Sequence, residues 1–161
     1  MRDLFAALAA IGLVLVAASL ATTLHVYRKR MRRARDSERA LGRSIIAELP
    51  TAEDLVLFSE DQSRFYYGNQ SIDKDLIAAV RVLINGAPIA AALSSRHPGA
   101  AALHPTSFDD RPEGIARDRW DVALETINGT VLVECGAIRE RVSQELARTI
   151  FAAVKRAIEA V

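Results

Sequence analysis

This sequence contains very little cysteine and no recognisable catalytic motif. Cys135 is the single cysteine, which excludes a disulfide within the chain and suits a reducing compartment such as the cytoplasm. The sequence contains neither G-x-x-x-x-G-K-[ST] nor G-x-G-x-x-G, so nucleotide binding through those phosphate-binding loops has no support. The sequence predicts no cofactor.

Charge is also absent from a long stretch near the N-terminus. The segment from Leu4 to Tyr27 contains no Asp, Glu, Lys or Arg. A helix needs about 20 apolar residues to cross a hydrocarbon core roughly 30 Å thick. The apolar part of this stretch, Leu4–Leu24, is therefore long enough to form a transmembrane anchor, which we assign to residues 1–27.

A cluster of positive charge follows the apolar stretch directly. It consists of Arg28, Lys29, Arg30, Arg32, Arg33 and Arg35. Because Lys and Arg accumulate on the cytoplasmic side of membrane helices, this basic run predicts a short N-terminus outside and a C-terminal domain in the cytoplasm. The same six side chains are candidates for contact with anionic lipid head groups at the membrane surface.

A cleaved signal peptide is the competing interpretation of the N-terminal stretch. Ser19-Leu20-Ala21 loosely fits a small-residue cleavage site. However, Arg2 is balanced by Asp3, and a run of arginines just after the cut would resist translocation. We therefore expect an uncleaved, single-pass anchor.

The rest of the chain is expected to form one small domain. Without the basic run the remaining charge is acidic, which argues against a nucleic-acid-binding surface. We divide this part into a juxtamembrane helix over 28–50 and a soluble domain over 51–161. Leu41, Ile45, Ile46 and Leu49 recur at helical spacing before Pro50, so a helix that runs on from the anchor would reach Leu49.

The first half of the soluble domain reads as a hairpin followed by a helix. Two short runs rich in strand-forming residues, 54–59 and 64–68, are separated by a polar turn and predict the hairpin. Apolar positions Ile72, Leu76, Ala79, Val80 and Leu83 then predict a helix that stops at Asn85-Gly86, with a second short helix over 89–93. Asn-Gly between apolar runs is also a hairpin signal, so 80–89 has a two-strand alternative.

The second half contains a long loop, a hairpin and a final helix. Periodicity is lost over 94–118, which contains three prolines, and this predicts a loop. Residues 119–127 and 130–135 flank Asn128-Gly129 and predict a hairpin with a type I′ turn. An i,i+4 row then predicts a long helix with its apolar residues at 138, 142, 146, 150, 154 and 158.

These elements predict an α+β protein. A transmembrane helix precedes a small two-layer domain, in which an antiparallel sheet of about four strands from two β-hairpins packs against helices, in the order α-ββ-α-(loop)-ββ-α.

Candidate chemical groups are few. The long loop holds His97, His104, Asp109, Asp110 and Glu113, but their spacing matches no compact metal or acid–base motif, and the sequence predicts no metal site. Cys135 shares a strand face with Val131 and Val133, so we expect a buried thiol rather than a nucleophile.

These observations favour a membrane-anchored protein with a cytoplasmic protein-interaction domain, acting as an accessory or scaffold subunit of a membrane complex. Two alternatives remain open. One is a membrane-tethered enzyme with its site in the 97–113 loop. The other is an extracytoplasmic, pilin-like subunit, although the early acidic residue expected in such helices is missing and the arginines are poorly placed for it.

Overall fold

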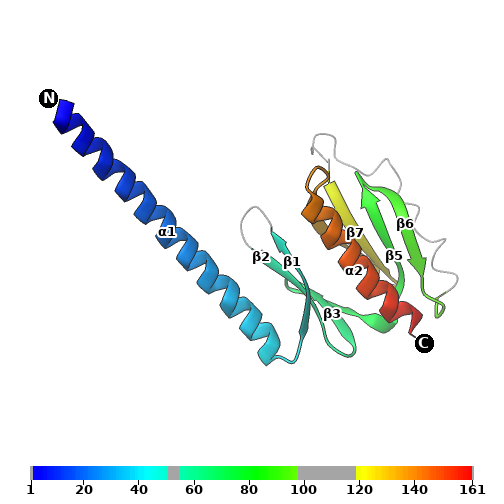
Figure 1. Cartoon of the computed structure of the whole chain (residues 1–161). Coiled ribbons are helices and arrows are strands. Elements are labelled where there is room, and N and C mark those ends of the chain that lie inside the picture. The colour runs from blue at the N-terminus through cyan, green and yellow to red at the C-terminus, as the bar shows by residue number, and fades with distance from the viewer. Residues whose placement is uncertain (1, 51–54, 98–118, 161) are drawn as a thin grey trace. The chain divides into compact units, whose positions relative to one another are not determined.

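The computed structural model describes residues 2–50, 55–97 and 119–160, with side chains from residue 11 onward (Figure 1). The chain divides into two compact units, Met1–Leu41 and Gly42–Val161. The first unit is helix α1, Arg2–Ala40. The helix continues through the basic run, as expected, and stops just before Gly42, whose φ of 74° suits glycine.

The predicted continuation of this helix to Leu49 is wrong. Residues Ser44–Pro50 form strand β1 instead. Ala47 and Leu49 of this strand are buried in the domain core. Tertiary packing therefore decides the conformation of this short segment, and the helical spacing of its apolar residues is a coincidence. The boundary between the two units consequently lies at Leu41, nine residues before the predicted end of the juxtamembrane helix.

The first sheet is an antiparallel meander with strand order β1-β2-β3-β4. Its other strands are β2, Leu55–Glu60, β3, Arg64–Tyr67, and β4, Gln70–Asp73. The predicted hairpin over 54–68 is confirmed as β2 and β3, which pair from Phe58–Tyr67 to Glu60–Phe65. Phe58 and Phe65 stack with ring centroids 5.5 Å apart and are both fully buried.

The second sheet has the order β6-β5-β7-β8 and follows a single 3₁₀ turn, η1, Lys74–Leu76. Its strands are β5, Ile77–Ile84, β6, Ala87–Leu93, β7, Arg119–Thr126, and β8, Gly129–Ala137. The helices predicted over 72–84 and 89–93 are therefore wrong, and the two-strand alternative is correct. Asn85 and Gly86 form the turn with φ angles of 51° and 76°, as a type I′ turn requires.

The hairpin predicted over 119–135 is confirmed as β7 and β8. Its turn residues are Ile127 and Asn128 rather than Asn128 and Gly129, because Thr126 pairs with Gly129. Asn128 is not among the described residues with positive φ, so the type I′ turn predicted here is found at Asn85-Gly86 instead.

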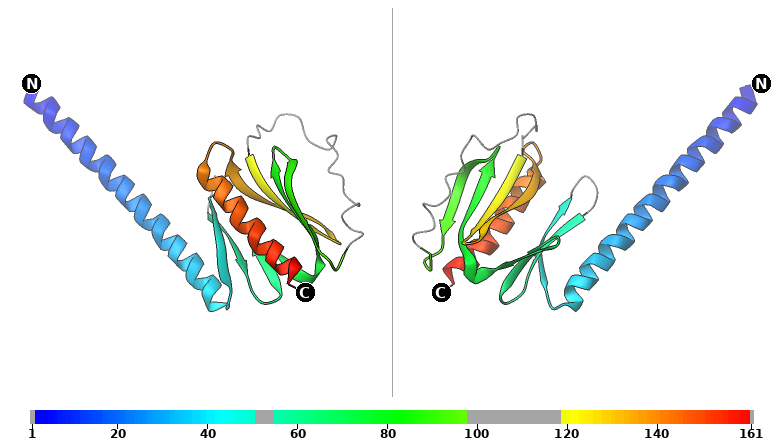
Figure 2. Two further views of the ribbon diagram at one scale, coloured as in Figure 1. Left: turned by 45° about the vertical axis from the view of Figure 1, so that its right-hand side comes forward. Right: turned by 180° about the vertical axis from the view of Figure 1, so that it is seen from behind.

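The C-terminal helix α2, Arg141–Glu159, closes the domain (Figure 2). It packs against strands of both sheets, including β1 and β5. The core joins Leu49 and Phe58 of the first sheet, Val80 and Leu124 of the second, and Ile150 of the helix. The α+β class with antiparallel sheets and packed helices is thus confirmed, with two sheets of four strands in place of one.

Candidate docking groove

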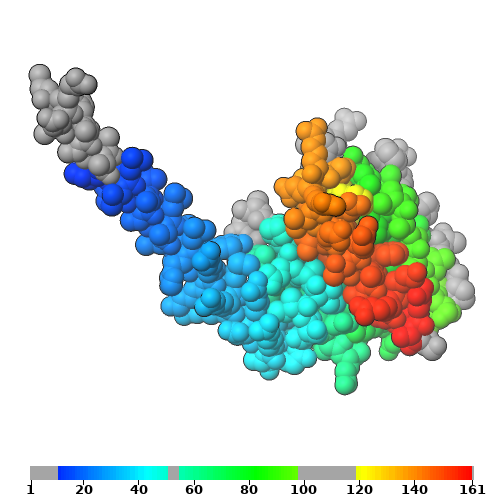
Figure 3. Space-filling model, viewed as in Figure 1, coloured from blue at the N-terminus to red at the C-terminus, as the bar shows by residue number. Residues whose placement is uncertain are grey.

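A groove of about 240 Å³ lies between helix α2 and the second sheet. Its walls come from four elements, β5, β6, β7 and α2, and are formed by Val82, Ile89, Ala90, Trp120, Gln144, Ala147, Arg148 and Phe151. We call it the α2–β6 groove. In Figure 3 the beginning of β7 shows as a small yellow area between the orange part of α2 and the green strands.

The groove exists because α2 begins at the opposite edge of the sheet. In the first turn of the helix, Ser143 is buried against Gly136 of β8, and a Cβ added to Gly136 would lie 2.6 Å from the Ser143 hydroxyl oxygen. This close approach, together with a φ of 112°, requires glycine at position 136. Since β8 and β6 are the two edges of the sheet, a helix that starts on β8 leaves β6 incompletely covered.

Strand β6 is an exposed and uncharged edge. Its sequence is Ala-Pro-Ile-Ala-Ala-Ala-Leu, and Ile89 and Leu93 are 55% and 51% exposed. Among the described strands it pairs with β5 alone. Edge strands commonly carry charged residues that prevent pairing with other chains. Here Pro88 is the one residue of that protective kind, and within the described residues the outer side of β6 has no strand partner.

The polar groups of the groove walls are hydrogen-bond donors or neutral amides. Arg148 lies 3.6 Å from Glu145 on the exposed side of α2, and Gln144 lies one turn before it. The indole Nε1 of Trp120 is shielded from water and has no hydrogen-bond acceptor within the described ranges. A buried donor without an acceptor costs about 1–3 kcal/mol, and because the nitrogen is covered, it is not exposed to a ligand in the groove.

The opposite face of the second sheet carries buried ion pairs. Arg81 lies 2.8 Å from Glu125, and Arg119 lies 2.8 Å from Asp121 and 2.9 Å from Glu134. Each buried carboxylate therefore has a guanidinium partner. This pairing is what buried charge requires for stability, and it provides no unpaired acid or base for catalysis.

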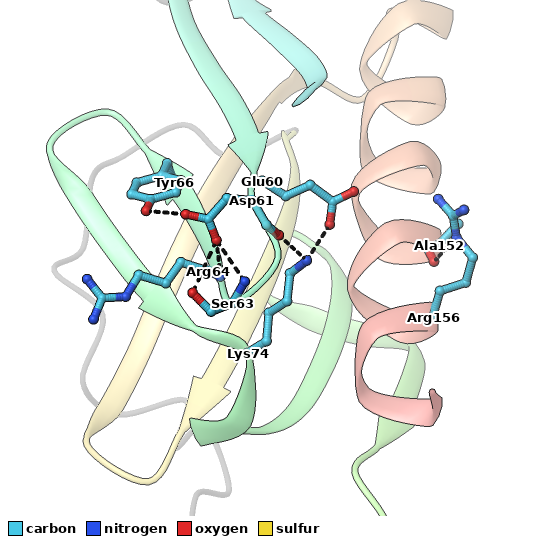
Figure 4. Close-up of polar contacts among 8 residues, drawn as sticks. All are labelled: Glu60, Asp61, Ser63, Arg64, Tyr66, Lys74, Ala152 and Arg156. Atoms are coloured by element: carbon cyan, nitrogen blue, oxygen red, sulfur yellow. Dashed lines mark hydrogen bonds and ion pairs between the residues drawn. The ribbon is translucent and has the colours of Figure 1, made fainter. Parts of the chain in front are cut away.

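A third polar cluster holds the turn between β2 and β3 (Figure 4). The Asp61 carboxylate accepts hydrogen bonds from the Tyr66 hydroxyl at 2.7 Å and from the backbone N–H groups of Ser63 and Arg64 at 2.8 and 2.7 Å. These bonds, led by that from Tyr66, lower the pKa of Asp61 to about 2. Nearby, the Lys74 ammonium lies 2.7 Å from Glu60. The Asp61 contacts lie within the hairpin and Lys74 joins its turn to η1, so the cluster fixes the turn.

The structure places the residues singled out in the sequence in separate regions. The basic run, Arg28 to Arg35, lies on α1 and is mostly exposed. At 100° per residue its six basic side chains are distributed around more than half of the helix circumference. Cys135 is buried, as expected, and burial raises the pKa of its thiol to about 12.

Of the candidate groups in the long loop, only His97 lies within the described residues. Its Nε2 is 2.9 Å from the backbone carbonyl oxygen of Asp75. His104, Asp109, Asp110 and Glu113, like most of the predicted loop 94–118, lie outside the described residues. In the ranges that are described, no group of three or more His, Cys, Asp or Glu side chains is arranged to hold a metal ion.

Comparison with protein families, curated proteins and solved structures finds no match to this chain. In the described part of the chain α1 is the one helix that is long and apolar enough to cross a membrane, with a mean hydropathy of 1.5 and no burial in its apolar window. A signal sequence near an N-terminus can meet the same criteria of length and apolar composition.

Proposed function

We propose that this chain is a single-pass membrane-anchored protein whose domain, Gly42–Val161, binds other proteins on the cytoplasmic side, as an accessory or scaffold subunit of a membrane complex. The observation that carries the proposal is the combination of an unburied apolar helix with a separately folded domain that presents an apolar groove.

The helix supports the membrane part of the proposal. Its exposed surface includes Leu13, Val14, Leu15 and Val16, each more than half exposed. Such a surface is unfavourable in water and favourable in lipid. The six basic residues that follow favour retention of the C-terminal side in the cytoplasm.

The domain supports the binding part. Contiguous exposed apolar surface beside a sheet edge is typical of protein-interaction sites. The apolar residues Ile89, Trp120 and Phe151 all contribute to the α2–β6 groove. Arg148 is the one charged side chain among the residues that line the groove, and no carboxylate or imidazole accompanies it there, so binding is better supported than catalysis.

A cysteine-accessibility assay tests the orientation. Native Cys135 is buried, so it stays unlabelled in the folded protein and needs no removal. A reporter cysteine at exposed Gln62, in the turn between β2 and β3, should react with a membrane-impermeant maleimide only after cells are opened. A reporter at Asp3 should react in intact cells. The reverse pattern would contradict the cytoplasmic placement.

Co-purification in a mild detergent tests the interaction. The full chain should elute with a partner of fixed stoichiometry, and substitution of Ile89 by Asp on the groove wall should release it. A monodisperse monomer without a partner would overturn the proposal.

A further inference from the structure

We infer that Asn128, in the turn between β7 and β8, is a site of spontaneous deamidation, whereas Asn85, which lies in the same Ile-Asn-Gly sequence, is protected by its contacts. The chain has three asparagines, and two of them precede glycine. A following glycine favours deamidation because it has no side chain to hinder attack by its backbone nitrogen. The inference does not depend on the proposed function.

The reaction needs only water and its ions as co-reactants. The backbone nitrogen of Gly129 loses its proton to hydroxide and attacks the side-chain Cγ of Asn128. The new N–Cγ bond closes a succinimide ring, the Cγ–Nδ2 bond breaks, and the amide nitrogen takes a proton from water and leaves as ammonia. Water then opens the ring at one of its two carbonyl carbons, which gives aspartate or isoaspartate at position 128. Nothing is oxidised or reduced.

Asn128 has the conformational freedom that this attack requires. It is exposed, and within the described ranges its side-chain amide has no hydrogen-bond partner. Its backbone N–H donates to the Thr126 hydroxyl oxygen at 3.2 Å, and the same hydroxyl donates to the Gly129 carbonyl oxygen at 2.8 Å. Gly129 and Thr126 form the last pair of the β7–β8 ladder, and the last pair of a ladder opens at little cost. When it opens, the Gly129 nitrogen is free to approach Cγ.

Asn85 is held at both its backbone and its side chain. Its backbone N–H donates to the Arg119 carbonyl oxygen, and its side-chain oxygen accepts a hydrogen bond from the Arg119 backbone N–H, each at 3.1 Å. Both bonds join the turn between β5 and β6 to the first residue of β7. Ring closure requires the backbone and the side chain of the asparagine to turn toward the glycine nitrogen, so these bonds oppose the reaction at Asn85.

The third asparagine, Asn69, separates the two requirements. It lies between β3 and β4, is exposed and has no side-chain partner in the part of the chain that the structure describes. However, it precedes Gln70, whose side chain hinders attack by its backbone nitrogen. Asn128 combines a free side chain with a following glycine. Its deamidation would replace a neutral amide by an ionised carboxylate beside Ile127, which is 57% exposed at the tip of the hairpin.

Peptide mapping of the full chain in a non-ionic detergent tests the inference. Trypsin cleaves after Lys and Arg and places the three asparagines in separate peptides, 65–74, 82–96 and 120–139. During incubation at pH 8, the mass increase that replacement of NH₂ by OH brings should accumulate in 120–139 at least about fivefold faster than in 82–96, and also faster than in 65–74. A protein isoaspartyl methyltransferase should label 120–139. In guanidinium, which unfolds the domain, 82–96 and 120–139 should react within about twofold of each other.

Two variants provide matched controls. Asn128→Gln should remove the modification from 120–139, because glutamine would have to close a larger ring. Thr126→Val removes the hydroxyl that holds the turn and keeps a branched strand residue, so it should speed the reaction at Asn128 at least about twofold and leave Asn85 unchanged.

Three results would overturn the inference. These are equal rates at Asn85 and Asn128 in the folded chain, a difference between them that persists in guanidinium, and a rate in Thr126→Val no faster than in the unsubstituted chain. None of these measurements involves membrane orientation or a partner, so a failure here is distinguishable from a failure of the proposed function.

Discussion

The Asp61 carboxylate accepts hydrogen bonds from one phenol and two backbone amides in the turn between β2 and β3. Because these bonds favour the charged form, its pKa falls from 3.8 to about 2. The stabilisation is therefore fully present above pH 4 and is lost as the pH falls toward 2. Asp61→Asn should keep an oxygen acceptor for the turn but lose this pH dependence.

Thermal unfolding between pH 2 and 5 measures the effect. The unsubstituted chain should lose more melting temperature across that range than Asp61→Asn does. Equal losses in the two proteins would mean that the Asp61 contacts contribute nothing to acid sensitivity.

Cys135 predicts a pH dependence at the alkaline end. Its thiol is 2% exposed, and burial raises its pKa from 9.0 to about 12. Above pH 9 the unfolded chain loses this proton and the folded chain keeps it, so the free energy of unfolding should fall by up to about 1.4 kcal/mol per pH unit from this group. Denaturant unfolding between pH 8 and 10.5 measures the slope.

Cys135→Ala is the matched control, because it removes the titrating group and leaves a small apolar side chain. Its slope should be shallower by the contribution of the thiol. The same slope in both proteins would show that Cys135 does not titrate on unfolding.

The proximity of the groove residues could not be predicted from the sequence. Trp120, Arg148 and Phe151 come from β7 and α2, and no spacing in the sequence links them to Ile89 of β6. Their proximity depends on the strand order β6-β5-β7-β8 and on where α2 crosses the sheet. The burial of Cys135, by contrast, follows from strand alternation with Val133, and it was predictable.

Helix α2 carries the next prediction, because its apolar row is only partly buried. Ile150, Val154 and Ile158 are buried, whereas Val142 of the same i,i+4 row is 64% exposed. The sequence predicted an unbroken i,i+4 row that begins at Ile138, whereas the helix begins at Arg141 and Ile138 lies before it. Ile150→Ala should cost about 2–5 kcal/mol of unfolding free energy through lost burial and a cavity, and Val142→Ala should stay within about 0.5 kcal/mol.

Chemical denaturation of both variants in the same detergent makes the comparison. A loss of more than about 1 kcal/mol for Val142→Ala would mean that the start of α2 packs more closely than the structure shows, because only unusual sites exceed the surface range.

The elements that sequence patterns misassigned share a physical cause. Strand β5, Ile77–Ile84, is buried on both faces over most of its length, so its apolar residues do not alternate and resemble a buried helix. Its content of Ile and Val, and the Asn-Gly that follows, were the signals that favoured a strand. Hairpins β2–β3 and β7–β8 were predictable because polar turns separate runs rich in strand-forming residues.

At the scale of the whole molecule, the basic run on α1 is predicted to set orientation collectively. Replacement of Arg28, Lys29 and Arg30 by Gln leaves the other three arginines of the basic run and should leave the domain in the cytoplasm. Replacement of all six basic residues should produce a mixture of orientations, because the Lys and Arg bias is then lost.

The reactivity of the Gln62→Cys reporter in intact cells measures the orientation of each variant directly. If only three replacements already move the domain out of the cytoplasm or release the co-purifying partner, the arginines make a specific contact. Anionic lipid head groups are one such contact.

The sequence predicted the class of the molecule better than its topology. An apolar helix, antiparallel strands and a terminal amphipathic helix follow from local periodicity and turn residues. The division into two four-stranded sheets does not, since it depends on where β4 ends and β5 begins, a junction marked only by the short turn η1.

The contact between β1 and α2 has a consequence for biosynthesis. The first strand of the domain packs against its last helix, so the core cannot close until the C-terminal residues have been made. At about 5–20 residues per second, the domain's 120 residues take roughly 6–24 s to synthesise after the first helix. An apolar helix made that early meets the insertion machinery while the domain is still unfolded. If α1 is the membrane anchor that we propose, its insertion precedes folding of the domain, and a premature stop before α2 would leave the helix joined to two sheets with an open core.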